Sequence, residues 1–168
     1  MVNSEKYWYA LYTKVNQEFK TADQLTKRAI EYYLPTVTKI KQWSDRKKKI
    51  TEPVIKGYIF IYADETERLD ALTIPSVVRC ISENGKPSKI PAWQIENFKL
   101  VIESKSDFIL YNGLVPGQSI EILNGPFKGV KGIVQAINNK NMNLAISINI
   151  LNRSLIIKLP EGIEYRKC

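Results

Sequence analysis

Hydrophobic patterning in the first third of the chain alternates between strand and helix. The segment Trp8–Thr13 (WYALYT) is aromatic and β-prone, which predicts a strand. From Glu18 to Glu31, apolar residues recur at helical spacing, which predicts an amphipathic helix. The apolar positions of this helix are Phe19, Ala22, Leu25, Ala29 and Ile30, and the polar stripe opposite them includes Lys20, Gln24, Lys27 and Arg28.

A long basic hairpin is predicted next. Tyr32–Trp43 alternates like a strand, Ser44–Lys47 is typical of a turn, and Lys48–Tyr62 forms a second strand interrupted at Pro53. The tip of this hairpin concentrates positive charge against a single acid, Asp45. Its basic residues are Lys39, Lys41, Arg46, Lys47, Lys48 and Lys49.

The pattern up to Ser104 indicates a mixed α+β fold with helices packed over a small sheet. Asp64-x-x-Glu67 predicts a helix start, and Ile74–Ile81 predicts a strand. Asn84-Gly85 marks a tight turn. After Pro91, apolar residues at helical spacing predict a helix.

The last third of the chain has a different character. Charged, Gly and Pro residues predict a linker at residues 105–116, between a domain at 1–104 and a second at 117–168. Short strands separated by turns then predict a small β-barrel. The expected strands are Ser119–Asn124, Val130–Ile137, Met142–Ile150 and Ser154–Leu159, with a turn at Asn138–Asn141. The density of Ile and Val favours strands over helix in this region.

The amino-acid composition limits the classes of function that this protein can have. The 168 residues contain no histidine and two cysteines, Cys80 and Cys168, so neither a metal site, a cofactor site nor a catalytic group is expected. No apolar run is long enough to cross a membrane and no signal peptide is visible, so we expect a cytoplasmic protein. The net charge of +8 favours an anionic partner such as nucleic acid or the ribosome.

Three of the eight glycines lie within ILNGPFKGVKG (Ile122–Gly132). A phosphate-binding P-loop would need GxxxxGK followed by Ser or Thr, and it would lead into a helix. Here Gly129 and Gly132 lead into the strand-like IVQAI. We therefore expect these glycines to permit a chain reversal and a curved strand rather than nucleotide binding.

Two motifs resemble one known family. GQSIEILNGPFKGVKGIV (Gly117–Val134) is similar to the KOW motif of small β-barrels in transcription and ribosomal proteins. WYALYTK (Trp8–Lys14), the hairpin, and EPVIKGYIFI (Glu52–Ile61) resemble the NusG amino-terminal domain. In its hairpin and its chain length, the protein resembles specialised paralogues such as RfaH and the Bacteroides capsule-locus regulators more than it resembles housekeeping NusG. A KOW RNA-binding protein of the ribosome or its assembly is the alternative, but it leaves the first hundred residues without a role.

The resemblance implies a transcription elongation and antitermination factor. Such proteins bind the clamp helices of the RNA polymerase β′ subunit over the DNA cleft and reduce pausing. Carried over by motif, the polymerase-binding residues are Tyr12, Ile55, Tyr58 and Phe60. Lys56 stands where the family usually has proline, and Ile55 replaces a common aromatic, so the details of the site differ.

Two further surfaces follow from the resemblance. By the resemblance, a basic stripe falls where family members contact the displaced non-template DNA strand. It comprises Lys14, Lys20, Gln24, Lys27 and Arg28. The alternative is that these residues form an ordinary solvated helix face. The loop Ile150, Leu151, Asn152 and Arg153 aligns with the surface that binds ribosomal protein S10 or the termination factor Rho. We expect a monomer that has no membrane partner.

Overall fold

The computed structural model describes residues 4–138 and 141–168, and these form two compact units that divide after Pro91. Residues 139 and 140, in the middle of the turn expected at Asn138–Asn141, lie outside the described residues. Within the described part, no helix is long and apolar enough to cross a membrane. Each unit is described below by itself.

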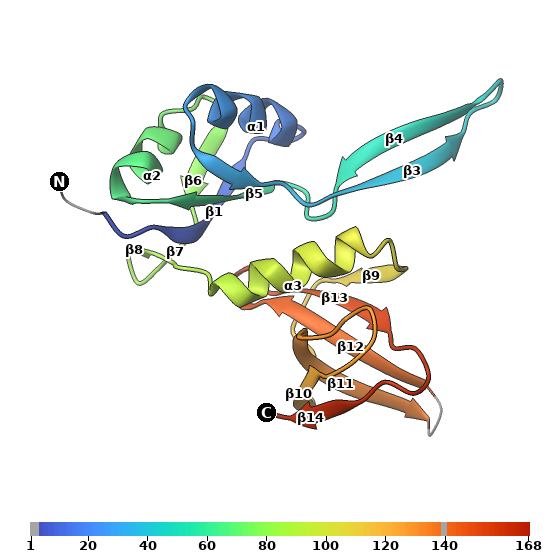
Figure 1. The fold of residues 1–168 in the computed structure, drawn as a ribbon. Coiled ribbons are helices and arrows are strands. Elements are labelled where there is room, and N and C mark those ends of the chain that lie inside the picture. Colours follow the sequence, from blue (N-terminus) through green and yellow to red (C-terminus); the bar gives the residue numbers. More distant parts are fainter. Residues whose placement is uncertain (1–3, 139–140) are drawn as a thin grey trace. The chain divides into compact units, whose positions relative to one another are not determined.

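The first unit is built on a four-stranded antiparallel sheet in the order β2-β5-β1-β6 (Figure 1). The central strands β1 and β5 pair from Tyr7↔Ala63 to Tyr12↔Tyr58. The elements of the sheet and its two helices are β1 (Tyr7–Thr13), α1 (Glu18–Lys27), β2 (Glu31–Tyr33), β5 (Tyr58–Ala63), α2 (Glu65–Leu72) and β6 (Val77–Cys80).

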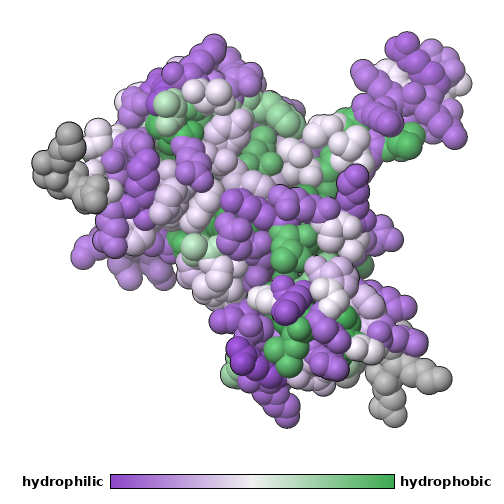
Figure 2. Space-filling model, in the orientation of Figure 1, coloured by the Kyte–Doolittle hydropathy of each residue, from purple (hydrophilic) through white to green (hydrophobic). Residues whose placement is uncertain are grey.

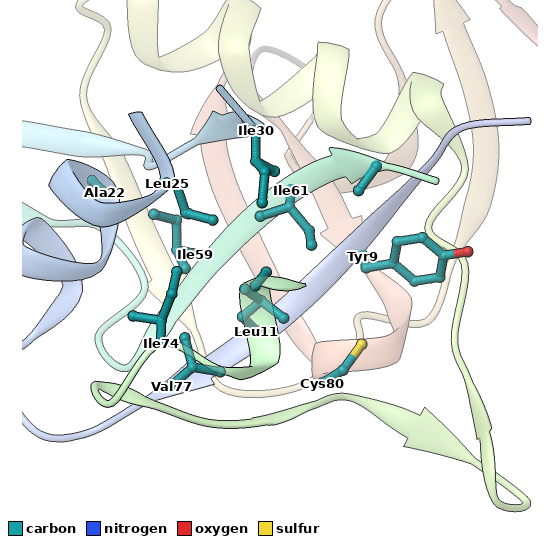
Figure 3. Close-up of a cluster of buried hydrophobic side chains, with 12 residues drawn as sticks. Tyr9, Leu11, Ala22, Leu25, Ile30, Ile59, Ile61, Ile74, Val77 and Cys80 are labelled. Carbon is teal, nitrogen blue, oxygen red and sulfur yellow. The ribbon is translucent and has the colours of Figure 1, made fainter. Parts of the chain in front are cut away.

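A hydrophobic core cluster of this unit lies on one face of the sheet. Leu11 of β1 and Ile59 and Ile61 of β5 are fully buried there, in one cluster with Leu25 of α1 and Ala71 of α2 (Figure 3). Both helices therefore cover this same face. Burial of such aliphatic side chains stabilises a fold by roughly 1.5–3 kcal/mol each, so this cluster contributes to the unit's stability.

Local signals set most of the element boundaries. Asp64 caps α2 in the predicted capping box: its side chain accepts from the Glu67 N–H, and the Glu67 side chain accepts from the Asp64 N–H. α1 ends four residues earlier than expected, because Ala29 adopts a left-handed conformation (φ 54°) that turns the chain toward β2. The tight turn at Asn84-Gly85 joins β7 (Ser82–Glu83) to β8 (Lys86–Pro87), as predicted.

The predicted long hairpin is divided into two parts. Its base, β2 and β5, belongs to the four-stranded sheet, whereas its outer part forms a separate two-stranded ribbon. The ribbon consists of β3 (Thr36–Gln42) and β4 (Lys47–Pro53). Pro35 precedes β3, and the loop Val54–Gly57 follows β4, so each strand is interrupted at the point where it leaves the sheet.

The second unit contains a six-stranded antiparallel sheet in the order β14-β10-β11-β12-β13-β9. Four of its strands match the predicted ones within two residues at each end. The elements are α3 (Ala92–Glu103), β9 (Phe108–Tyr111), β10 (Gln118–Ile122), β11 (Lys131–Asn138), β12 (Asn141–Ile148), η1 (Asn149–Leu151), β13 (Arg153–Lys158) and β14 (Tyr165–Lys167). Ile133–Leu159 is thus strand-rich, in line with its β-branched composition.

The units divide at Pro91, whereas the sequence placed the boundary at Ser104. Two buried polar side chains of α3 find their partners on the second unit: Asn97 Nδ2 donates to the Lys131 carbonyl at 2.7 Å, and Gln94 Oε1 accepts from the Asn149 N–H at 3.3 Å. The predicted linker also contains β9, which pairs with β13. A buried polar group needs a hydrogen-bond partner, and these contacts group α3 with the sheet of the second unit.

The glycine-rich segment connects β10 to β11, a strand-to-strand connection that excludes a P-loop. The Gly129 N–H donates to the Ile122 carbonyl at 2.8 Å, and the Ile122 N–H donates to the Val130 carbonyl at 3.0 Å, which closes the loop. A Cβ on Gly132 would lie 2.6 Å from the Ala145 carbonyl oxygen on β12. Glycine is required there because the two strands approach closely.

Candidate functional site

The face of the first sheet opposite the hydrophobic cluster is aromatic. Side chains alternate along a strand, so the neighbours of Leu11, Ile59 and Ile61 point to the other face. Three ring pairs form on that face: Tyr12–Tyr58, Trp8–Tyr62 and Tyr33–Phe60, with centroids 5.4, 5.4 and 6.4 Å apart. Neither α1 nor α2, the two helices among the described residues of this unit, packs on this face.

Tyr12 lies at the centre of the contacts at one end of this aromatic face. Its ring contacts that of Tyr58, and the Arg79 guanidinium lies 5.8 Å from the Tyr12 centroid. Gly57 lies against the ring edge, where a Cβ would be 3.1 Å from Tyr12 Cε2. Tyr12 and Tyr58 are half-buried, so both rings are packed yet keep accessible surface.

The loop that precedes β5 is fixed by hydrogen bonds from two other elements. The Gly57 N–H donates to Glu18 Oε1 at 2.7 Å, and the Thr13 N–H donates to the Gly57 carbonyl at 2.9 Å. Glu18 is buried, at the first residue of α1. The carboxylate thereby links the start of α1 to the loop that positions Tyr58, with Lys56 exposed beside it.

The four residues predicted for polymerase binding fall into two groups. Tyr12 and Tyr58 are half-buried and adjacent, whereas Ile55 is 2% exposed and Phe60 fully buried. Trp8, Tyr33 and Tyr62 were not among the predicted residues and lie on the same face, with Trp8 buried and both tyrosines half-buried. Aromatic residues at alternate positions of β1 and β5 did indicate that their rings share one face of the sheet. The sequence could not show, however, which face the helices cover.

The predicted basic stripe lies partly on one face of α1. Lys20 and Lys27 are exposed and Gln24 is half-buried between them, at spacings of four and three residues that share a helix face. Asp23 is also exposed on α1, next in sequence to Gln24. Lys14 is exposed in the connection between β1 and α1.

Arg28 has intramolecular partners instead. Its Nη1 donates to Asp70 Oδ1 at 2.7 Å, to the Asp70 carbonyl at 2.8 Å and to Thr73 Oγ1 at 2.7 Å. These contacts tie the end of α1 to the end of α2. The guanidinium satisfies the Asp70 carbonyl in the last turn of α2, which is a structural role at a helix C-terminus.

The predicted partner loop connects β12 to β13. Leu151 is buried, Ile150 and Arg153 are half-buried, and Asn152 is exposed in a left-handed conformation (φ 51°). Arg153 Nη1 donates to the Leu151 and Asn152 carbonyls at 3.1 and 3.2 Å. The loop is therefore internally braced, with Asn152 exposed and Ile150 and Arg153 partly accessible.

The chemistry of Cys80 argues against thiol reactivity at this residue. Cys80 is buried in the hydrophobic cluster, and burial raises the pKa of its thiol above the ordinary value. The thiolate is the reactive form, so a raised pKa keeps this side chain inert at neutral pH.

Comparison with known proteins decides the family. The family model described as "Transcription termination factor nusG" matches residues 6–99, more than half of the chain. The chain belongs to the NusG family. It is thus a member of a family of transcription termination and antitermination factors, which supports the expected absence of enzymatic activity.

Relatives extend this likeness beyond the matched segment. The NusG transcription termination/antitermination protein of Haemophilus influenzae is 22% identical over 95% of this chain and 93% of its own. That of Rickettsia bellii is 23% identical over 94% and 90%. A solved structure of Thermotoga maritima NusG, described under domain interaction, is also similar: the match covers 92% of this chain and 93% of that one, with a TM-score of 0.52 and 18% identity. This likeness supports the fold.

Proposed function

We propose that this NusG-family protein is an elongation and antitermination factor that binds the clamp helices of the RNA polymerase β′ subunit and reduces pausing. The observation that carries the proposal is the aromatic face of the first unit, within the segment that matches the family model. Aromatic rings are enriched in the cores of protein interfaces. Tyr12 and Tyr58 are its accessible anchors, with Ile55 and Phe60 supporting them from buried positions.

The predicted basic stripe would contact the displaced non-template DNA strand. Lys20 and Lys27 supply exposed cations on one helix face, Lys14 adds a third, and Gln24 can donate and accept hydrogen bonds. Phosphate contacts of this kind add affinity without reading sequence. Arg28 has a lesser part in this proposal because its guanidinium is occupied by Asp70 and Thr73.

The second unit would bind a further protein, ribosomal protein S10 or Rho, through Ile150–Arg153. Asn152 is exposed and Ile150 is half-buried, and the contacts of Arg153 to two loop carbonyls brace the loop. A preorganised loop loses less conformational entropy on binding. The alternative of a KOW RNA-binding protein of the ribosome is less favoured, because the family match gives the first unit a role in transcription.

Co-purification and transcription together test the proposal. We expect the full chain to co-purify with elongating RNA polymerase and to shorten the pause lifetime in a single-round transcription assay. A protein that associates with free ribosomal subunits and leaves pausing unchanged would contradict it.

A further inference from the structure

The β3–β4 hairpin is a surface that the proposed function does not use. Figure 1 shows the two strands extending away from the sheet of their unit as a narrow ribbon. Seven residue pairs join them, from Thr36↔Pro53 to Gln42↔Lys47. Every residue from Thr38 to Lys49 is exposed. A two-stranded hairpin without cover is marginally stable in water, so this ribbon is costly to maintain for architecture alone.

Positive charge is concentrated on the ribbon. Six cationic side chains and two acids, Asp45 and Glu52, lie between Thr36 and Pro53, so this short segment carries about half of the chain's net charge of +8. Figure 2 shows the arm as mostly hydrophilic. One acid is already matched, since Lys41 Nζ lies 2.6 Å from Glu52 Oε1.

The strand register distributes these cations over both faces. Directly paired residues share a face, and faces alternate along each strand. The Lys41↔Lys48 pair, and Lys39 two residues earlier, therefore lie on one face, where Lys48 Nζ is also 5.4 Å from the Trp43 ring centroid. Lys47 and Lys49 lie on the opposite face. A ribbon that bound a flat surface would need cations on one face only.

We propose that the β3–β4 hairpin is a second nucleic-acid site, which inserts into the major groove of double-stranded DNA and contacts phosphates on both sides of the groove. Paired strands lie ~4.8 Å apart. The major groove is about 12 Å wide and admits a two-stranded ribbon, so lysine side chains on both faces can span the remaining width to the two phosphate backbones. The deep, narrow major groove of A-form RNA excludes this geometry.

The hairpin site is separate from the basic stripe, and its binding to DNA does not require polymerase. We expect phosphate contacts to dominate, because five of the six cations of the hairpin are lysines, which act as point charges toward phosphate. We therefore expect binding to depend strongly on salt and weakly on sequence.

The test uses the full chain without polymerase and three probes: short duplex DNA, the same sequence as single-stranded DNA, and the matching RNA duplex. Fluorescence anisotropy across about 50–200 mM salt gives the affinity and its salt slope. Lys39→Glu/Lys48→Glu changes one face, and Lys47→Glu/Lys49→Glu changes the other. Lys128→Glu/Lys167→Glu alters two exposed lysines of the second unit by the same total charge and is the matched control.

We expect each face variant to lower duplex-DNA affinity at least tenfold and to reduce the log–log salt slope by about 1.8, the value for two lost phosphate contacts. The control should stay near wild type, and RNA duplex should bind more weakly than DNA duplex. Loss in one face variant only would overturn insertion into a groove. An equal loss in the control would show an effect of total charge, and equal losses on single-stranded DNA would show that the hairpin does not select duplex.

Trp43 gives an independent readout. It is 47% exposed near the hairpin tip, so duplex DNA should change its fluorescence in the wild type. Trp43→Phe removes that signal but should leave affinity within a few-fold. A fluorescence change that persists in Trp43→Phe would place the DNA elsewhere and contradict the proposal.

Discussion

The ring of Tyr12 packs against Gly57 so closely that a Cβ on this glycine would lie 3.1 Å from Tyr12 Cε2, nearer than an ordinary van der Waals contact. Gly57 also has a left-handed φ of 84° and donates its N–H to Glu18. Tyr12, the loop before β5 and α1 are thus coupled through one residue without a side chain. The aromatic face depends on this glycine for the placement of Tyr58.

Gly57→Ala should destabilise the first unit. The left-handed backbone costs a residue with a Cβ about 1–2 kcal/mol, and the contact with Tyr12 adds to it. Gly85→Ala is the matched control, because Gly85 has a φ of 75° and open space around its Cα. Amide exchange of β1 and β5 measures the effect. Equal losses in the two variants would show that the Tyr12 contact adds nothing.

Tyr58→Ala should weaken binding to RNA polymerase while the first unit stays folded. The side chain is half-buried against Tyr12, and aromatic anchors of interfaces commonly cost about 2 kcal/mol or more when truncated. Tyr165→Ala, an exposed tyrosine of the second unit, is the control for loss of a ring. If the folded Tyr58 variant still retains polymerase in a pull-down as the wild type does, Tyr58 is not part of the site.

Lys20→Glu/Lys27→Glu should lower affinity for the single-stranded non-template DNA of an elongation complex. Each lost phosphate contact should reduce the log–log salt slope by about 0.7 for a single strand. Lys128→Glu/Lys167→Glu again controls for total charge. An unaltered slope would return these lysines to the role of a solvated helix face. Together with the hairpin variants, the experiment separates single-strand from duplex binding.

Ile150→Glu should weaken binding of the second unit to S10 or to Rho. Ile150 is half-buried in the loop before β13, and a charge there opposes an apolar contact by more than about 1 kcal/mol if the residue is an anchor. Ile109→Glu is the control, since Ile109 is a 69% exposed isoleucine on β9 of the same unit. Titrating S10 and Rho separately identifies the preferred partner. If the Ile150 variant binds each partner as tightly as the Ile109 variant does, the loop is not the site.

Glu52→Gln should raise the affinity of the hairpin for duplex DNA at neutral pH. The hydrogen bond from Lys41 lowers the pKa of Glu52 below its usual value, so the carboxylate is charged and competes with phosphate for Lys41. The stability that this pair adds to the hairpin is present above the unfolded-state pKa and is lost as the pH falls through the lower, folded-state pKa. Anisotropy from neutral to acidic pH should therefore show the wild type approaching the variant. A difference that stays constant through that range would contradict the competition.

Much of this protein follows from local sequence. The alternation of Trp8–Thr13 specified a strand, and the Asp64–Glu67 capping box specified the start of α2, because each depends on contacts within a few residues. The β-branched residues around Ile146 and Ile148 likewise specified strands. The WYALYTK and KOW motifs were sufficient to indicate the family, since they lie on such locally determined elements.

Tertiary structure decided what each element faces. Alternation alone assigned Phe60 and Ile59 to opposite sides of β5, but only the packing of α1 and α2 showed that the side of Ile59 is the helix-covered core. Arg28 belonged to a basic stripe by helical spacing, yet Asp70 and Thr73, more than forty residues away, occupy its guanidinium. The helix α3 belongs to the second unit, where the Asn97 amide donates to the Lys131 carbonyl. These outcomes depend on long-range contacts, and residues distant in sequence become neighbours only when the chain has folded.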